Sequence, residues 1–429
     1  MTTHVWPGMF DYLANRGHAA NAIQNSVREL NLLDDVLEGR PPETNYATNF
    51  GMIEAGFTGS TFEGLWVAGV LAALKYERPF RYGADADHLQ VKRGPAGVEH
   101  AKRLIRASRY YSFFTLDVAD VLNYAALNEP SKAAAESFLT KDIPDATERS
   151  GVIEHHTRPF SVGGRAYRID QAELGRFVGK YWKALDTVGD LAKYIVSLKN
   201  GVPFDLELTV DEHPPEVAAF DCLTTDTEVL FLAREIRRRG LPITHLAPNF
   251  GQEKGYDYRC PDGLAGLESR TRAQFQIASE FELTLDVHSG DDLQKATRQA
   301  FGRATGGKVH FKVSPMLPII FAELLQDYHP ELFKRWWSDA VAYARREATA
   351  GSDLARTCLA ELDSSPGGRP SAKQKVFHYF SFPYVGRRNA AGQFVCRADF
   401  YKLSPQFEAA HRDRMRTWLG EIADDLQLK

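Results

Sequence analysis

One short segment of the sequence combines residue types that perform acid–base and metal chemistry. Residues 83–88 read Gly-Ala-Asp-Ala-Asp-His, so that Asp85, Asp87 and His88 follow a run that contains aromatic residues. A carboxylate can remove a proton from a substrate, and an imidazole can bind a divalent cation. A helix N-cap at Asp85 or Asp87 beside a surface histidine is the plainer alternative. The segment predicts a catalytic site if a second segment of the same kind joins it in space.

A second such segment lies at residues 286–292, where His288 and several aspartates follow a hydrophobic run. The run 283–287 predicts a β-strand, and a histidine just after a strand can meet a divalent cation at that end of a parallel sheet. By itself His288 would be read as a hydrogen-bonded structural histidine. The two segments together indicate one metal site that His88 and His288 share.

Acidic and apolar residues alternate in the segment that begins at Asp205. Asp205, Glu207, Thr209 and Asp211 share one face of a strand, because side chains in a strand point to the same side every second residue. On an edge strand that face would be solvated. In a central strand it would be buried, and a buried carboxylate needs a proton, a partner or a metal. Glu207 is therefore a candidate acid or base.

Four further residues could belong to the same site. Glu253 and Asp257 lie in the polar segment 251–258, and His310 and Lys312 share one face of the predicted strand 309–313. An ordinary polar loop and a core histidine are the alternatives for these positions. As a group they strengthen the hypothesis of a site with acids, a base and cation ligands.

One motif resembles a phosphate-binding loop but lacks its essential features. Residues 302–308 have the glycine and lysine spacing of a P-loop, yet Val309 replaces the required Ser or Thr and a strand is predicted to follow instead of a helix. We therefore expect no phosphate site there.

The pattern of predicted elements alternates strands with helices, which is typical of an α/β fold with a parallel sheet. Strands are predicted at 19–23, 80–84, 111–116, 204–210, 243–247, 283–287, 309–313 and 376–382. Helices are predicted at 99–107, 228–239 and 270–281 from apolar residues three and four apart. Eight strands and a length of 429 residues favour a (β/α)8 TIM-type barrel, in which the carboxyl ends of the strands meet.

The expected organisation is a single barrel domain over residues 1–429 with one insertion and a closing helix. Residues 128–199 interrupt the alternation and predict a hairpin at 158–169, which turns at Gly163 and Gly164, and a long helix at 171–197. The segment 364–375 is rich in glycine and proline and predicts a surface loop. Residues 404–429 end the chain, and 405–428 predict an amphipathic closing helix.

Composition predicts a cytoplasmic enzyme. The formal net charge is only -4 in 429 residues, so no nucleic-acid partner is expected. The longest apolar run, 65–74, is about half of the roughly 20 residues that cross a membrane, and residues 1–7 carry no basic region for export. No two of the four cysteines form a C-x-x-C pair, which predicts free thiols at Cys222, Cys260, Cys358 and Cys396.

With these segments assembled, the chain resembles the tagaturonate epimerase family, whose members interconvert tagaturonate and fructuronate in hexuronate breakdown. The resemblance extends over most of the chain between about residues 20 and 390. The segments that carry it are 24–29, 83–88, 114–117, 207–212, 237–240, 253–258, 288–290 and 304–307, together with His310 and Lys312. Members of this family are expected to have a further segment before the motif at 24–29, which this chain lacks.

The resemblance implies a role for each candidate residue. Asp87 matches the proton acceptor and Glu207 the proton donor, while His88, His288 and Glu253 match ligands of a divalent cation such as Zn, Mn, Ni or Fe. The resemblance also implies six substrate-binding residues, which are Ser26, Glu29, Thr115, Asp257, His310 and Lys312. The expected partner is a small sugar acid, and the chain could form a homo-oligomer.

The implied reaction inverts a carbinol carbon β to a ketone, which enolisation cannot reach. We hypothesise retro-aldol cleavage, in which Asp87 takes the hydroxyl proton, the metal acts as a Lewis acid and Glu207 reprotonates the rebuilt alcohol. No G-x-G-x-x-G follows a predicted strand, so no NAD is expected. A proton-shift aldose-ketose isomerase, a glycoside hydrolase using Asp87 and Glu207, and a non-catalytic sugar-acid binding protein are the alternatives.

Overall fold

A computed structural model of the chain describes residues 2–25, 38, 61–211, 219–253, 255–288, 290–364, 369–387 and 395–429. The described residues form two compact units. Unit 1 takes its residues from Met1–Ala86, Ser289–Asp292 and Val313–Asp424, and unit 2 from Asp87–His288, Leu293–Lys312 and Asp425–Lys429.

Seven strands form one sheet in the order β1-β2-β3-β6-β7-β8-β9. The strands are β1 (Ala19–Asn25), β2 (Arg81–Gln90), β3 (Phe113–Asp117), β6 (Asp205–Thr209), β7 (His245–Ala247), β8 (Thr284–Val287) and β9 (His310–Phe311). Every pair in this sheet whose register is defined is parallel. Seven of the predicted strands are therefore confirmed, and the alternation of strands and helices did indicate a parallel α/β fold.

The register of the central strands sets polar residues side by side. Thr115 of β3 pairs with Glu207 of β6, and Glu207 pairs in turn with His245 of β7. Asp286 of β8 pairs with His310 of β9. Paired residues of neighbouring parallel strands project to the same face of a sheet, so this register gathers acids and imidazoles on one face.

Helices of unit 2 connect these strands, and their ends follow local sequence signals. They are α4 (Gly94–Ala107), α5 (Lys132–Asp142), α6 (Ala146–Thr157), α7 (Gln171–Lys199), α8 (Asp226–Arg238), α9 (Gly263–Glu280) and α10 (Lys295–Thr305). A capping box formed by Thr225 and Glu228 starts α8. Asn200, in the left-handed conformation, ends α7. The helices predicted at 99–107, 228–239 and 270–281 are all present, with shifted ends.

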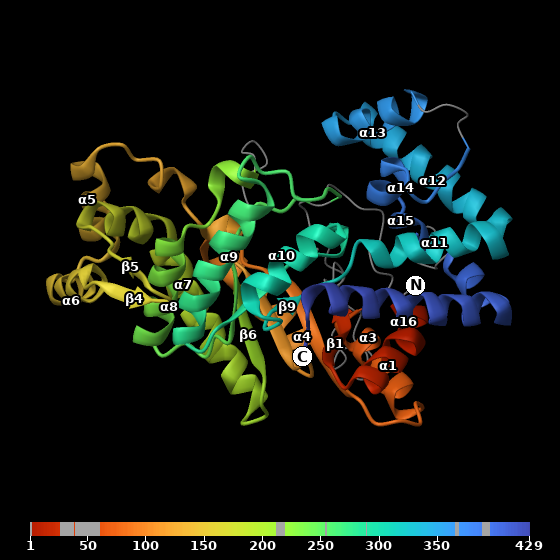
Figure 1. Ribbon diagram of the computed structural model, residues 1–429, viewed down its shortest axis with the longest axis horizontal. Helices are drawn as coiled ribbons and strands as arrows, with labels where there is room; N and C mark the ends of the chain where they lie inside the picture. Colours follow the sequence, from red (N-terminus) through yellow and green to blue (C-terminus); the bar gives the residue numbers. More distant parts are fainter. Residues whose placement is uncertain are drawn as a thin grey trace. The chain divides into compact units, whose positions relative to one another are not determined.

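The predicted hairpin and long helix are also present in unit 2. Strands β4 (Phe160–Val162) and β5 (Arg165–Tyr167) pair antiparallel and are joined by Gly163 and Gly164. Both glycines have positive φ, which a two-residue turn of this kind requires. Figure 1 shows the hairpin, α5 and α6 gathered beside α7.

The motif at 302–308 forms the end of a helix and not a phosphate loop. Gly306 has a φ of 61° and caps α10, and β9 follows it. A Cβ on Gly302 would lie 2.8 Å from the backbone of Asp425, so close packing explains that glycine. The strand predicted to follow this motif is confirmed.

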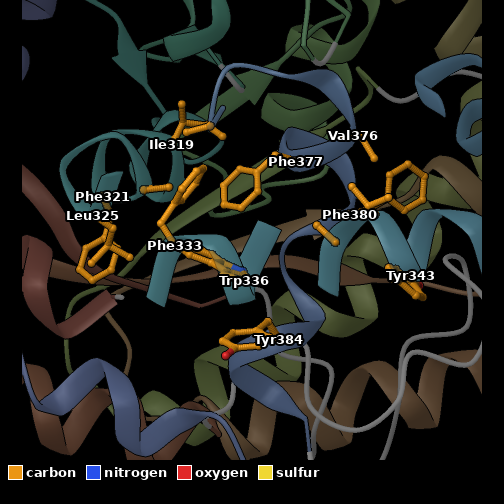
Figure 2. Packing of buried hydrophobic residues seen from close by; sticks show 14 of the residues in the cluster. Ile319, Phe321, Leu325, Phe333, Trp336, Tyr343, Val376, Phe377, Phe380 and Tyr384 are labelled. Carbon is orange, nitrogen blue, oxygen red and sulfur yellow. The ribbon is translucent and has the colours of Figure 1, made fainter. Parts of the chain in front are cut away.

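Unit 1 is mainly helical and contains a dense aromatic core. Its helices are α1 (Thr2–Arg16), α3 (Phe62–Leu74), α11 (Met316–Tyr328), α12 (Pro330–Thr349), α13 (Asp353–Ser364), α14 (Lys375–Phe380), α15 (Pro383–Gly386) and α16 (Pro405–Leu426). Trp336 of α12 is fully buried, and its indole N–H donates to the carbonyl of Ser381 at 2.7 Å. Figure 2 shows the rings of Phe333, Phe377 and Tyr384 around it.

Two sequence-based expectations about strands are wrong. The segment 376–382 is the helix α14 and the turn after it, because Val376, Phe377 and Phe380 bury their side chains in the core around Trp336 at helical spacing. In addition, β2 continues to Gln90, so residues 85–88 lie within the strand and not beyond its end. The described residues show no eighth strand and no pairing of β9 with β1, so the sheet is not seen to close into a full barrel.

The structure also bears on two expectations from composition. All four cysteines are free, as predicted. Within the described part of the chain, no helix combines the length and the apolar character needed to span a membrane.

Candidate active site

A cluster of acids, imidazoles and one ammonium lies on unit 2, where five strands contribute side chains. The members are Asp87 and His88 from β2, Thr115 and Asp117 from β3, Glu207, Thr209 and Asp211 from β6 and the residues after it, Asp286 and His288 from β8 and its end, and His310 and Lys312 from β9 and its end. We call this set the acid–imidazole cluster. Most of its side chains are buried.

Lys312 joins two candidate catalytic carboxylates. Its Nζ donates to Asp87 Oδ1 at 2.9 Å and to Thr115 Oγ1 at 2.6 Å, and lies 3.0 Å from Glu207 Oε2. The side chain of Lys312 is only 5% exposed, so water screens these interactions little. One ammonium therefore balances charge on both carboxylates.

His288 lies between two other carboxylate oxygens. Its Nε2 is 2.7 Å from Glu207 Oε1, and its Nδ1 is 3.0 Å from Asp211 Oδ2. Thr209 donates its hydroxyl to the second oxygen of Asp211 at 2.5 Å. The predicted buried face of a central strand is confirmed for Glu207 and Thr209. Asp211 lies beyond the end of β6 with a half-buried side chain, and Asp205 at the start of β6 is exposed.

His88 lies opposite His288 and adopts an uncommon backbone conformation. Its φ is 51°, in the left-handed region that residues other than glycine seldom enter. The two imidazole centroids are 5.0 Å apart, and His88 Nδ1 is 2.9 Å from Asp87 Oδ1. A separation of this size allows both imidazoles to reach one cation.

A second acid–imidazole pair lies where β8 and β9 pair. His310 Nδ1 donates to Asp286 Oδ2 at 2.6 Å. The His310 ring also contacts Phe113 and His245, with centroids 5.0 and 5.2 Å away. These contacts fix the orientation of His310 beside the carboxylates.

The protonation of the cluster follows from burial and from charged neighbours. Burial alone would raise the pKa of Asp87, but His88 and Lys312 hold that pKa well below its usual range. Burial would lower the pKa of His88, but Asp87 raises it to about 9. The pKa of His288 is raised well above its usual value, because Asp211 and Glu207 outweigh its burial. The acids thus favour a positive charge beside both imidazoles, which either a proton or a bound cation can supply.

For two other groups on this face, burial decides the direction of the pKa shift. Burial and the neighbouring His310 lower the pKa of His245 to about 4, so His245 is neutral near pH 7. Burial also raises the pKa of Asp117. A neutral imidazole and a carboxyl of raised pKa therefore border the charged residues.

Two groups in the cluster have donor atoms suited to a divalent cation. Single ligand atoms of Glu207, Asp286 and His310 all lie within 4.8 Å of one another. However, Lys312 already places a positive charge 3.0 Å from Glu207 and 4.0 Å from Asp286, and it would repel a metal ion there.

The pair His88 and His288 fits a divalent cation better. His288 Nδ1 is buried and, among the residues that the structure describes, has no hydrogen-bond partner of good geometry, although a carboxylate oxygen lies 3.0 Å away. An imidazole nitrogen and a carboxylate oxygen in this arrangement match the donors that such cations bind. The proposed metal ligands His88 and His288 therefore suit a shared ion.

The structure brings most of the sequence-predicted site residues together. Asp87, His88, Thr115, Glu207, His288, His310 and Lys312 all belong to the acid–imidazole cluster. Glu253 instead pairs with Arg259, whose Nη2 donates to Glu253 Oε1 at 2.8 Å. Asp257 accepts from the backbone N–H of Gln294 and the hydroxyl of Thr297 at the start of α10. Ser26 and Glu29 lie outside the described residues.

Sequence reasoning assigned no role to several members of the cluster. Asp211 and Asp286 were visible as acids that share a strand face with Glu207 and His288, respectively, which is the signal that could have found them. Asp117 had the same signal, because it lies two residues after Thr115 in the sequence. His245 had no such signal, because only the pairing of distant strands brings it to this face.

A model of the tagaturonate epimerase family matches residues 52–352, which is well over half of the chain. The chain belongs to the tagaturonate epimerase family. A tagaturonate/fructuronate epimerase from Thermotoga maritima is 31% identical over 260 residues, which make up 59% of this chain and 48% of that protein. The match thus spans about half the length of that relative.

Solved structures support the fold of this tagaturonate epimerase family member. The native crystal structure of a fructuronate-tagaturonate epimerase from Cohnella laeviribosi superposes with a TM-score of 0.74 at 20% identity, covering 100% of this chain and 80% of that one. A glycerol complex of the same protein gives a TM-score of 0.73 with the same coverage and identity. At this identity the likeness concerns the fold alone.

Proposed function

We propose that this protein is a metal-dependent epimerase that interconverts D-tagaturonate and D-fructuronate. The observation that carries the proposal is the family match over residues 52–352. The acid–imidazole cluster supports it, because it gathers carboxylates that can move protons and imidazoles that can bind a cation. The family substrate is a six-carbon keto acid, and the two sugars differ at the carbinol carbon β to the ketone.

Retro-aldol cleavage is the proposed mechanism, since the ketone acidifies only the C–H next to it. Asp87 removes the proton of the β-hydroxyl, and the bond between the α and β carbons breaks. Its electron pair passes to the ketone as an enediolate, and the β carbon becomes an aldehyde. The aldehyde rotates, the bond forms again on its other face, and Glu207 protonates the new alkoxide. Atoms and electrons balance, and no redox cofactor takes part.

Lys312 is suited to restore the two carboxylates between turnovers. Glu207 can act as the proton donor once it has received a proton from Lys312, and after one reaction Asp87 holds a proton that Lys312 can take back. The Nζ of Lys312 lies 2.9 Å from Asp87 and 3.0 Å from Glu207, so it can donate a proton to Glu207 and accept one from Asp87. Hydrogen-bond distances of this size support direct proton transfer.

His88 and His288 would hold the divalent cation, which is Zn, Mn, Ni or Fe in this proposal. When bound, the cation supplies Lewis-acid stabilisation of negative charge on the substrate oxygens. Glu253 is the third ligand that the family resemblance implies. It would have to exchange its ion pair with Arg259 for the cation.

The remaining assignments concern the substrate and the setting of the enzyme. Thr115, His310 and Lys312 are proposed to bind the sugar acid, and the ammonium of Lys312 suits its carboxylate. Ser26, Glu29 and Asp257 are proposed as further substrate contacts on the resemblance alone. We also propose a cytoplasmic location, which the four free thiols support, and a possible homo-oligomer.

Product analysis with defined variants tests this function. The protein is stripped with a chelator, supplied with each divalent metal in turn and incubated with D-tagaturonate, and the products are separated by chromatography. We expect fructuronate with at least one metal, none after chelation, and none from Asp87→Asn or His288→Ala. Asp205→Asn changes an exposed carboxylate of the same strand and should keep the activity. Absence of fructuronate with every metal would refute the proposal.

Isotope labelling distinguishes the mechanism from a proton-shift isomerase. Retro-aldol chemistry exchanges hydroxyl protons only, so the product formed in deuterated water should carry no deuterium on carbon. Deuterium bound to carbon would refute the retro-aldol step and favour proton transfer at the carbon next to the ketone.

A further inference from the structure

Asp211 contributes a carboxylate beside the candidate metal ligand His288. Asp211 lies two residues beyond β6, and its Oδ2 is 3.0 Å from His288 Nδ1. The other nitrogen of His288, Nε2, lies 2.7 Å from Glu207 Oε1. Because an ionised carboxylate only accepts hydrogen bonds, Nε2 carries the hydrogen in this contact.

This hydrogen bond leaves Nδ1 as the ligand nitrogen of a neutral imidazole. A histidine that binds a metal commonly donates its other N–H to a carboxylate, which fixes the ring and its tautomer. Glu207 has this position relative to His288. The lone pair of Nδ1 then points into the space that it shares with Asp211.

Two electron-rich atoms in buried surroundings need a positive charge between or beside them. His288 is only 7% exposed. Within the described residues, its Nδ1 lacks a hydrogen-bond partner of good geometry. Asp211 Oδ2 nevertheless approaches it to 3.0 Å. A proton on the line between Nδ1 and Oδ2 would make a hydrogen bond of normal geometry. A cation that binds both atoms from one side of that line would instead explain why they lie close together without such geometry.

His88 supplies the third donor around the same space. Its Nδ1 is turned to Asp87 at 2.9 Å, so its Nε2 would be the ligand atom, and the His88 and His288 rings are 5.0 Å apart. We infer that Asp211 is a direct ligand of the divalent cation and completes a set of two imidazoles and one carboxylate with His88 and His288. Asp211 then takes the ligand position that the resemblance gives to Glu253, whose carboxylate pairs with Arg259. This inference rests on the metal dependence in the proposed function.

The neighbours of Asp211 suit this role. Thr209 donates to Oδ1 of Asp211 at 2.5 Å, which orients the carboxylate and leaves Oδ2 toward His288. Two imidazoles with one carboxylate select Zn, Mn, Fe or Ni over Mg and Ca, which prefer oxygen ligands alone. Three protein ligands leave coordination positions open, which a ketone oxygen and an adjacent hydroxyl of a sugar acid can occupy.

Metal titration without substrate tests the ligand role of Asp211. The chelator-treated full-length protein is titrated with Mn²⁺ by calorimetry, and Asp211→Asn is compared with Asp205→Asn as a matched control. We expect the dissociation constant to rise at least about tenfold in Asp211→Asn and to change less than about twofold in the control. Circular dichroism of the metal-free variants verifies that both fold. Equal affinity of Asp211→Asn and the parent protein would overturn the inference.

A spectroscopic variant separates direct ligation from mere positioning. In Asp211→Cys loaded with Co²⁺, a thiolate ligand gives charge-transfer absorption in the near ultraviolet that the parent protein, with the same four native thiols, should lack. Its absence in a folded, Co²⁺-loaded variant would overturn direct ligation. Because neither measurement uses a sugar, an Asp211-dependent site in a protein without epimerase activity would refute the proposed function and leave this inference standing.

Discussion

Replacing Lys312 with methionine should destabilise unit 2 strongly, because it removes the ammonium that two buried carboxylates share. The Nζ lies 2.9 Å from Asp87 and 3.0 Å from Glu207, and Glu207 has no exposed surface. Methionine retains much of the apolar length of lysine, so Lys312→Met isolates the loss of charge. The variant also loses the hydrogen bond from Lys312 to Thr115.

The size of the effect follows from the cost of leaving buried charge uncompensated. Removing one partner of a buried ion pair costs about 3–5 kcal/mol. Since about 1.4 kcal/mol corresponds to a factor of ten, the amides of β6 should exchange roughly 100-fold to several thousand-fold faster. Adding Glu207→Gln removes one of the stranded charges and should restore at least about 1 kcal/mol.

Native-state hydrogen exchange followed by mass spectrometry of peptides from β3 and β6 measures this effect. Lys180→Met is the matched control, because Lys180 is another buried lysine of unit 2, paired with Glu228 at 2.9 Å outside the acid–imidazole cluster. We expect both variants to lose protection and only Lys312→Met to lose epimerase activity. If exchange in β6 of Lys312→Met stayed within about fivefold of the parent, the histidines would already supply the positive charge, and the reasoning about Lys312 would be wrong.

Three further predictions concern other parts of the molecule. Burial lowers the pKa of His411 to about 4, so the unfolded state binds more protons than the folded state between about pH 6.5 and 4. The free energy of unfolding of unit 1 should therefore fall by about 3 kcal/mol as the pH falls through that window. His411→Phe, which keeps the stack on Phe407, should flatten this dependence in unfolding curves measured from pH 7 to pH 4. In α7, Gly175→Ala places a Cβ 2.1 Å from the carbonyl oxygen of Ala135 and should lower the free energy of unfolding by about 1–3 kcal/mol. Gly189→Ala has room for a Cβ and should raise the free energy of unfolding by about 0.5–1 kcal/mol. Equal melting temperatures of the two variants would contradict this. Chelation should remove epimerase activity, and a single divalent metal should restore it; activity that survives chelation would contradict metal dependence.

The sequence predicted the strands of the sheet well, because buried parallel strands leave short hydrophobic runs that few other elements imitate. The exception at 376–382 shows why such runs can mislead. Its aromatic residues suit a strand, yet Phe377 packs against Trp336 and Phe380 against Tyr343, which favours a helix. Tertiary contacts here outweigh local preference.

The sequence predicted which residues belong to the site better than it predicted the contacts between them. Period-two alternation revealed the buried face that holds Glu207, and the position after β8 revealed His288. Contacts such as Lys312 with Asp87 depend on strands that are distant in sequence, so no local pattern encodes them. For Glu253, the family resemblance suggested a metal ligand, whereas the structure gives it an ion pair with the nearby Arg259.

The position of Lys312, directly after the short strand β9, affects the order in which the cluster is assembled during synthesis. Lys312 follows Asp87 by 225 residues, so at typical rates of synthesis the carboxylate leaves the ribosome roughly 10–45 s before its ammonium partner exists. Until then, the early acids gain more by remaining in water than by entering a low-dielectric interior. The acid–imidazole cluster is thus complete only after Lys312 has been synthesised, and a nascent or truncated chain that stops before Lys312 should bind neither sugar nor metal in the native manner.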